Sequence, residues 1–217
     1  MGLTVLTIDE IFWWIATALN YLFAIMLYKR SKTVKVSWKM NYFLGVTLFF
    51  IIHATCRIPY IFYDYYTPEP KSPLMWNLGA LLGIISITVL IFFIENIIIK
   101  KTKHLCTLYG IIGILLFLVV INYPEWKGIW QTGFVTPLAL IVPLFYLIFA
   151  KQTTGSVRNN SLLMFVGVFI FEVSQVAHSD LIWSRFPTLI PVFQLIGSIF
   201  MILGLAIAYI AVNRTEF

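Results

Sequence analysis

The stretch from Leu74 to Ile99 reads LMWNLGALLGIISITVLIFFIENIII and carries a single charged residue, Glu95. As a helix it would rise about 39 Å, which exceeds the roughly 30 Å hydrocarbon core of a bilayer. Its apolar residues are continuous, whereas the strands of membrane β-barrels alternate apolar and polar residues. The stretch therefore predicts a membrane-spanning helix.

Six other apolar runs have the same character, and only short connections separate them. The seven predicted spans are Glu10–Tyr28, Met40–Tyr63, Leu74–Ile99, Leu105–Asn122, Ile129–Ala150, Ser161–Trp183 and Thr188–Val212. Because no stretch is left for a soluble domain, residues 1–217 are predicted to form one domain, an all-α bundle of seven transmembrane helices. We expect a multi-pass protein of the cell membrane, with the lipid bilayer as its main partner.

The composition excludes several classes of protein. Hydrophobic residues make up 60% of the chain and charged residues 11%, against about 45–50% and about 25% in soluble domains. A net charge of +6 is found in many nucleic-acid-binding proteins. Here, however, the charges lie in short clusters between apolar runs, which is typical of signals that orient membrane helices. No nucleic-acid partner is expected.

Lysine and arginine predict the orientation. The cytoplasmic side should carry the greater number of them, and one side of the predicted bundle holds Lys29, Arg30, Lys32, Lys35, Lys39, Lys100, Lys101, Lys103, Lys151, Arg158 and Arg214. The opposite side holds Lys71, Lys127 and Arg185. This distribution predicts that the N-terminus is outside and the C-terminus is cytoplasmic. Six tryptophans are expected near the outer interface: Trp13, Trp14, Trp76, Trp126, Trp130 and Trp183.

Two parts of the chain resemble each other. The segment Phe43–Val46 (FLGV) is similar to Phe165–Val168 (FVGV), and the third and seventh spans each begin near a proline, Pro73 and Pro191. One interpretation is a 3+1+3 parallel repeat, an arrangement known in transporters. The alternative is chance, because apolar helices draw on few residue types.

Ionised residues inside predicted spans need an explanation. A charge at the bilayer centre costs about 2.5–3.5 kcal/mol on insertion scales. Arg57 lies in the outer half of the second span and Glu172 near the middle of the sixth. Pairing them would lower this cost, so we expect a contact between them. Glu95 lies one turn from the cytoplasmic lysines and is expected to pair with Lys100 or with a neighbouring helix.

The outer half of the predicted bundle gathers further polar side chains on shared helix faces. Together they predict an outward-opening polar pocket, whose expected ligand-binding residues are Arg57, Glu172, His53, Gln175, Asn77, Gln194 and His178. Such residues face the bundle interior or a wet cavity. The alternative is purely structural, since hydrogen bonds between membrane helices contribute about 0.6 kcal/mol on average.

Three prolines lie inside predicted spans. A proline removes a backbone donor and frees the carbonyl four residues before it. Pro59, Pro137 and Pro143 therefore free the carbonyls of Thr55, Gly133 and Ala139. These positions are expected to be kinks, which either shape a cavity or are static bends.

No pattern nominates a reaction, a cofactor or a metal. The last span, Thr188–Val212, contains no lysine for a retinal Schiff base. His53 and Cys56 share a helix face but give two ligands, fewer than a zinc site needs. Glycine-rich phosphate loops and nucleophile elbows are missing from the sequence. No catalytic residues are assigned, and an enzyme is the less favoured class.

Three functions remain open. The first is a transporter or channel for an ion or a small polar or anionic solute, which the predicted pocket favours. The second is a seven-helix sensor or receptor module that signals through a separate cytoplasmic partner, docked on the basic loop Lys29–Lys39. The third is an accessory subunit of a larger membrane complex. The sequence does not decide among them.

Overall fold

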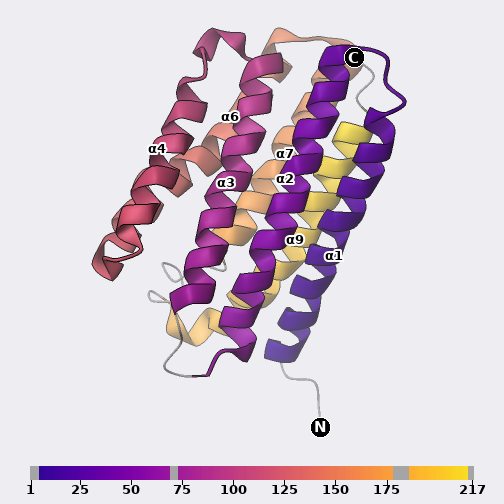
Figure 1. Cartoon of the computed structure of the whole chain (residues 1–217). Coiled ribbons are helices and arrows are strands. Elements are labelled where there is room, and N and C mark those ends of the chain that lie inside the picture. Colours follow the sequence, from indigo (N-terminus) through magenta and orange to yellow (C-terminus); the bar gives the residue numbers. More distant parts are fainter. Residues whose placement is uncertain (1–4, 69–72, 178–185, 215–217) are drawn as a thin grey trace.

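The computed structural model describes residues 5–68, 73–177 and 186–214. Within these ranges the chain is helical almost throughout and has no β-strand, which confirms the predicted all-α class. Figure 1 shows the helices as a bundle. They are α1 (Val5–Ser31), α2 (Ser37–Ile61), α3 (Pro73–Ile97), α4 (Leu105–Val120), α5 (Lys127–Trp130), α6 (Thr136–Gln152), α7 (Gly155–Ala177) and α9 (Ile190–Asn213). Single π-helical turns, Phe62–Tyr66 and Gln131–Val135, follow α2 and α5.

The helix lengths change the predicted count of full spans. Six described segments are long and apolar enough to cross a membrane: Ile8–Ser31, Ser37–Tyr66, Pro73–Ile97, Lys127–Gln152, Gly155–Ala177 and Ile190–Asn213. The helix α4, which covers the fourth predicted span, has 16 residues and rises about 24 Å, less than the hydrocarbon core. The described chain thus has six long apolar helices and one shorter one, which fit a multi-pass protein in a lipid bilayer.

Helix α7 extends beyond the apolar run from which its span was predicted. The helix α7 begins at Gly155, not at Ser161. Gly155 has a positive φ of 63°, so it adopts a conformation that is easy for glycine at the turn from α6. The first turns of α7 are polar, and Asn160 within them donates a hydrogen bond of 2.8 Å to the carbonyl of Arg214. The end of the predicted span Ser161–Trp183 lies outside the described residues.

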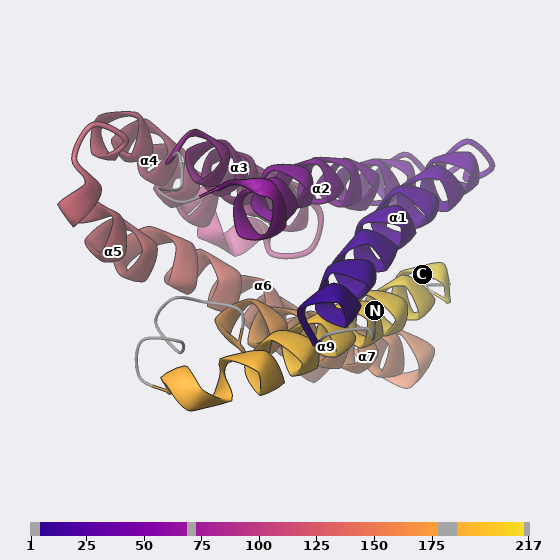
Figure 2. The ribbon, with the colours of Figure 1, turned by 90° about the horizontal axis from the view of Figure 1, so that it is seen from below.

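The helices form two layers. Figure 2 shows α4, α3, α2 and α1 following one another in one layer, with α6, α7 and α9 in the other. On one side α1 packs against α9, and on the other α3 and α4 contact α6. Between the layers, the ring of Phe49 from α2 meets that of Phe171 from α7 with centroids 6.1 Å apart. Side chains from helices that are far apart in the sequence therefore meet in the interior between the two layers.

Glycines set the closest helix crossing, between α7 and α9. A Cβ atom at Gly167 would lie 2.6 Å from the backbone nitrogen of Ala208, and one at Gly204 would lie 2.6 Å from the nitrogen of Phe171. Small residues permit such close approach of backbones in membrane bundles. In the first layer, Gly45 of α2 faces the side chain of Phe93 on α3.

The expected irregularity at Pro137 is present, and a neighbouring helix compensates for it. The π-turn Gln131–Val135 precedes this proline, and the carbonyl of Gly133, which the proline leaves without its helical donor, accepts a hydrogen bond from the Tyr109 hydroxyl. Nearby, the indole nitrogen of Trp130 donates a 2.8 Å hydrogen bond to the carbonyl of Gly113. Tyr109 and Gly113 belong to α4, so these bonds attach α4 to the following helix. Trp130 is 3% exposed, so its side chain packs inside the bundle.

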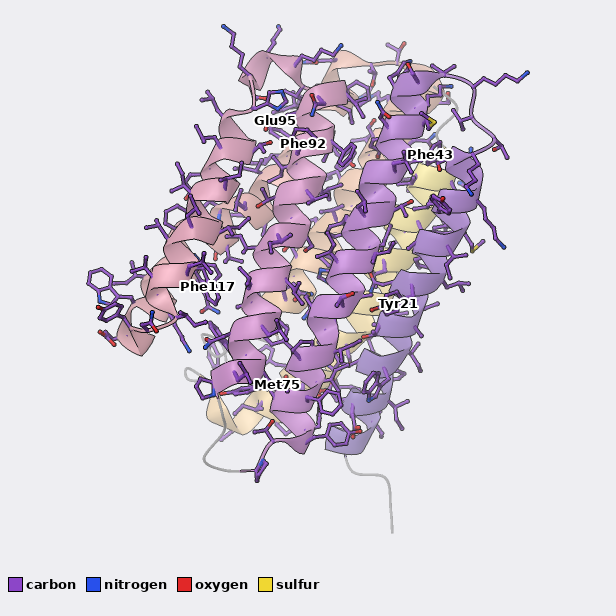
Figure 3. The ribbon with its side chains drawn as sticks, viewed as in Figure 1. Tyr21, Phe43, Met75, Phe92, Glu95 and Phe117 are labelled. Carbon is purple, nitrogen blue, oxygen red and sulfur yellow. The ribbon has the colours of Figure 1, made fainter. Side chains whose placement is uncertain are left out.

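Glu95 caps α4. Its Oε1 accepts from the backbone N–H of Cys106 at 3.1 Å, and its Oε2 accepts from the N–H of Thr107 at 2.8 Å and from the Thr107 hydroxyl. The first amides of a helix lack internal partners and carry partial positive charge. The prediction that Glu95 pairs with a neighbouring helix is confirmed. Glu95 lies at the upper end of the bundle in Figure 3.

Candidate functional site

Two helices from opposite layers supply the centre of the candidate site. His53 and Arg57 are four residues apart on α2, and Glu172 and Gln175 are three residues apart on α7. These spacings put each pair on one helix face. Both faces point into the interior between the layers, because a hydrogen bond joins Arg57 to Gln175.

Arg57 is nearly enclosed, with 7% of its surface exposed. Its Nε donates to Nε2 of His53 at 3.2 Å, and its Nη2 donates to Oε1 of Gln175. The guanidinium carbon lies 4.9 Å from the ring centroid of Trp13 and 5.8 Å from that of Tyr60. Aromatic faces attract a cation most strongly when water is excluded. The positive charge of Arg57 is therefore stabilised by neutral hydrogen-bond acceptors and by the faces of two aromatic rings.

The contact predicted between Arg57 and Glu172 is not formed. Among the described residues no ion pair within 4.0 Å joins them, and Arg57 binds Gln175, nearly one turn further along α7. A neutral amide satisfies the guanidinium donors at lower desolvation cost than a second buried charge would. Glu172 remains close enough for an electrostatic interaction with Arg57. This is a correction to the expected pairing.

Glu172 is half-buried and lines a small cavity between the two layers. The cavity has a volume of about 20 Å³, enough for about one water molecule. Its other walls are apolar: Phe49, Phe50, Ile87, Leu90, Val142, Val168, Phe171, Gly204, Leu205 and Ala208. Within the described part of the chain the Glu172 carboxylate has no hydrogen-bond or ion-pair partner.

His53 is buried among aromatic rings. Its ring centroid lies 5.4 Å from that of Phe49 and 4.7 Å from that of Phe171. Because Arg57 donates to Nε2, this nitrogen must carry a lone pair, and a neutral ring then has its proton on Nδ1. Nδ1 lies 4.0 Å from the Cys56 sulfur. His53 thus orients the guanidinium as an acceptor.

Asn77 and Gln194 also lie in the interior, near the first turns of α3 and α9. Each is 7% exposed, and each has a side-chain oxygen that accepts no hydrogen bond in the described part of the molecule. A buried oxygen without a donor costs about 1–3 kcal/mol. These two amides are therefore suited to accept hydrogen bonds from water or from a bound solute. His178, the last predicted site residue, lies outside the described residues.

Sequence reasoning missed the contribution of α1. Trp13 is 2% exposed and lies over Arg57, although a place in the outer aromatic belt was expected for it. One turn earlier, Asp9 is fully buried and accepts a hydrogen bond from the Tyr65 hydroxyl. The signal in the sequence was the i, i+4 spacing of Asp9 and Trp13, which puts both on one face of α1.

Of the predicted pocket residues that the structure describes, only Glu172 lines either of two cavities in the bundle. The cavity at Glu172 admits about one water, and a larger cavity of about 310 Å³ lies near the opposite end of α2 and α3. Arg57 lines neither of them. The candidate site is therefore a buried polar cluster around Arg57 in the bundle interior, with a small cavity lined by Glu172.

The comparisons with known proteins assign no relatives. No protein family model, no curated protein and no solved structure matches this chain.

Proposed function

We propose that this protein transports an ion or a small solute across the membrane, and that Glu172 is the residue that binds the transported or coupling cation. One observation carries the proposal: Glu172 lines an interior cavity, and its carboxylate has no ion-pair partner in the described chain. Ionisable side chains inside a bundle are costly to insert and commonly belong to ion pathways or proton relays. A proton is the simplest cation that fits a cavity for one water molecule.

The other polar residues predicted for the site favour a cation or a donor-bearing solute over an anion. The Nε and Nη2 groups of Arg57 already donate to His53 and Gln175, so fewer donors remain for an anion. The oxygens of Asn77 and Gln194, by contrast, accept nothing in the described chain. Acceptor oxygens suit hydrogen-bond donors and hard cations. The anionic solute considered from the sequence is therefore the less favoured substrate.

The two-layer arrangement supports a transporter over an open channel. The cavity at Glu172 lies where α2 and α3 of one layer face α6, α7 and α9 of the other. Binding sites between two helix groups that rock against each other are the usual basis of alternating access. The proposed orientation puts the N-terminus outside and the C-terminus in the cytoplasm of the cell membrane, with α4 as the fourth of seven crossings. A 3+1+3 repeat remains part of this proposal, supported by the matching positions of Gly45 and Gly167 against the next long helix.

Flux in liposomes tests the proposal. The purified protein is reconstituted with a trapped pH-sensitive dye, and proton entry is followed after a membrane potential is imposed, with and without sodium or potassium. We expect the wild type to pass protons or cations and Glu172→Gln to abolish this flux. Glu125→Gln is the matched control, because Glu125 is exposed and lies outside the cavity.

Each alternative function gives a different result. A stable wild-type protein that carries neither protons nor alkali cations contradicts the transport proposal. Thermal stabilisation by a solute without flux favours the sensor or receptor, whose partner would then be sought among cytoplasmic proteins. Stoichiometric copurification of another membrane protein, again without flux, favours the accessory subunit.

A further inference from the structure

The larger cavity lies at the end of the bundle where Glu95 is seen in Figure 3. It measures about 310 Å³, near the lower limit of about 300 Å³ for ligand pockets. Two helices of one layer and one of the other form its walls. They contribute Trp38 and Tyr42 from α2, Asn96 and Ile97 from α3 with Lys100 just beyond it, and Phe149 from α6.

The lining combines polar and apolar side chains. Lys100 and Asn96 are exposed, whereas Tyr42 is buried and its hydroxyl is 3.0 Å from the hydroxyl of Tyr146. Ile97 and Phe149 provide apolar surface between them. Asn96 donates one amide N–H to the carbonyl of Phe92 at 2.9 Å, and its second N–H is available. A ligand for this cavity should thus have an acceptor group joined to an apolar part.

Basic residues lie at and beside the cavity, and the nearest acid, Glu95, forms no ion pair with Lys100 in the described chain. Lys100 is followed by Lys101, and Lys39 lies 5.7 Å from the ring centroid of Trp38. In the described chain the Lys100 ammonium makes no ion pair. Both carboxylate oxygens of Glu95 are occupied by the N–H groups of Cys106 and Thr107. The acceptor group of the ligand should therefore be an anion.

The depth of the cavity matches that of a phospholipid phosphate. The apolar stretch of the third span ends at Ile99, so Lys100 is the first charged residue beyond it. In a bilayer this position lies at the boundary of hydrocarbon and headgroups, where basic residues meet anionic lipids. A free phosphate ion would use Lys100 and Asn96 but would gain nothing from Trp38, Ile97 and Phe149.

We infer that this cavity binds the headgroup of one anionic phospholipid, with its phosphate on Lys100 and Asn96 and its glycerol end against the apolar wall. The inference does not depend on the transport proposal, because the two cavities share no lining residue. A bound lipid would fill the space between α2, α3 and α6 and hold the two layers together at this end.

Lipid binding in detergent tests the inference. Short-chain phosphatidylglycerol, phosphatidylcholine or inorganic phosphate is added to the purified full-length protein, and retained lipid is counted by native mass spectrometry. The wild type should retain one phosphatidylglycerol. Lys100→Gln should weaken its affinity roughly fivefold or more, the effect of one basic residue at a membrane surface. The control is Lys101→Gln, because Lys101 has the same charge and is exposed, yet does not line the cavity.

Three results would overturn the inference. Equal weakening by Lys100→Gln and Lys101→Gln would show general charge attraction and no defined site. Equal retention of phosphatidylcholine would show that the anionic charge is not recognised. Retention of inorganic phosphate as strong as that of phosphatidylglycerol, at equal concentration, would assign the site to a free anion and not to a lipid.

Discussion

The guanidinium of Arg57 donates a hydrogen bond to the side-chain oxygen of Gln175, and this bond links α2 in one layer to α7 in the other. His53 accepts a second bond at 3.2 Å, and the ring of Trp13 covers the cation. The hydrogen bonds to the buried guanidinium therefore come from neutral side chains, and no carboxylate is in direct contact with it. One consequence is that Glu172, on the same face of α7, is left for another partner.

Replacing Gln175 with leucine should destabilise the bundle. Gln175→Leu removes the acceptor for Arg57 and leaves a buried charged donor unpaired, which costs about 1.5–3 kcal/mol. Thermal unfolding in mild detergent measures the change. Gln131→Leu is the control, because Gln131 is exposed and its side chain is not part of the cluster. Equal unfolding temperatures for Gln175→Leu and the wild type would show that the Arg57–Gln175 bond does not stabilise the fold.

The close crossing of α7 and α9 should not tolerate a methyl group. In Gly204→Ala the new Cβ would lie 2.6 Å from the backbone nitrogen of Phe171 and 2.7 Å from the carbonyl oxygen of Gly167. Backbone atoms cannot rotate away, so the helices must separate, at a cost of about 1–3 kcal/mol. The matched variant is Gly83→Ala, since a Cβ at Gly83 meets nothing within 4 Å. We expect a lower unfolding temperature for Gly204→Ala and an unchanged or higher one for Gly83→Ala. The reverse order would contradict the close packing of α7 against α9 at Gly204.

Glu95 should control the order of the first turn of α4. Glu95→Ala removes the acceptor of the Cys106 and Thr107 amides, and loss of such a cap costs about 0.5–2 kcal/mol. Hydrogen exchange followed by mass spectrometry should show faster exchange in a peptide that contains both residues. Glu125→Ala, in the segment beyond α4, should leave this peptide unchanged. Unchanged exchange in Glu95→Ala would mean that the cap does not hold the turn.

The shorter helix α4 should still cross the bilayer. Single cysteines are placed at Lys103 and Glu125, on either side of α4, in a chain whose Cys56 and Cys106 are changed to alanine. A membrane-impermeant thiol reagent added to intact cells should label Glu125→Cys and label Lys103→Cys only after the cells are opened. Labelling of both from outside would show that α4 does not cross, and labelling of Lys103→Cys alone would reverse the proposed orientation.

Part of the candidate site could be predicted from the sequence. The i, i+4 pair His53 and Arg57 and the i, i+3 pair Glu172 and Gln175 follow from helix periodicity, so their shared faces were predictable. The partner of Arg57 was not, because Glu172 and Gln175 are less than one turn apart on α7. The rotation of that helix and the geometry of the guanidinium determine which of them Arg57 reaches. Trp13 was assigned to the membrane interface because tryptophan is common there, and its contact with a buried cation came from the position of α1.

The sequence by itself determined the helical class, the apolar spans and the carbonyl that Pro137 leaves free, because these depend on hydropathy and on backbone covalent geometry. The tertiary structure decided which helices share a layer, that α4 is attached by Tyr109 and Trp130, and that Arg57 lies in a buried cluster while Glu172 lines a cavity of about 20 Å³. The physical reason is that lipid solvates all apolar helices about equally well, so hydropathy does not determine which helices become neighbours. Their order and rotation are set by close contacts such as that of Gly167 with Ala208, and such contacts join residues that are far apart in the chain.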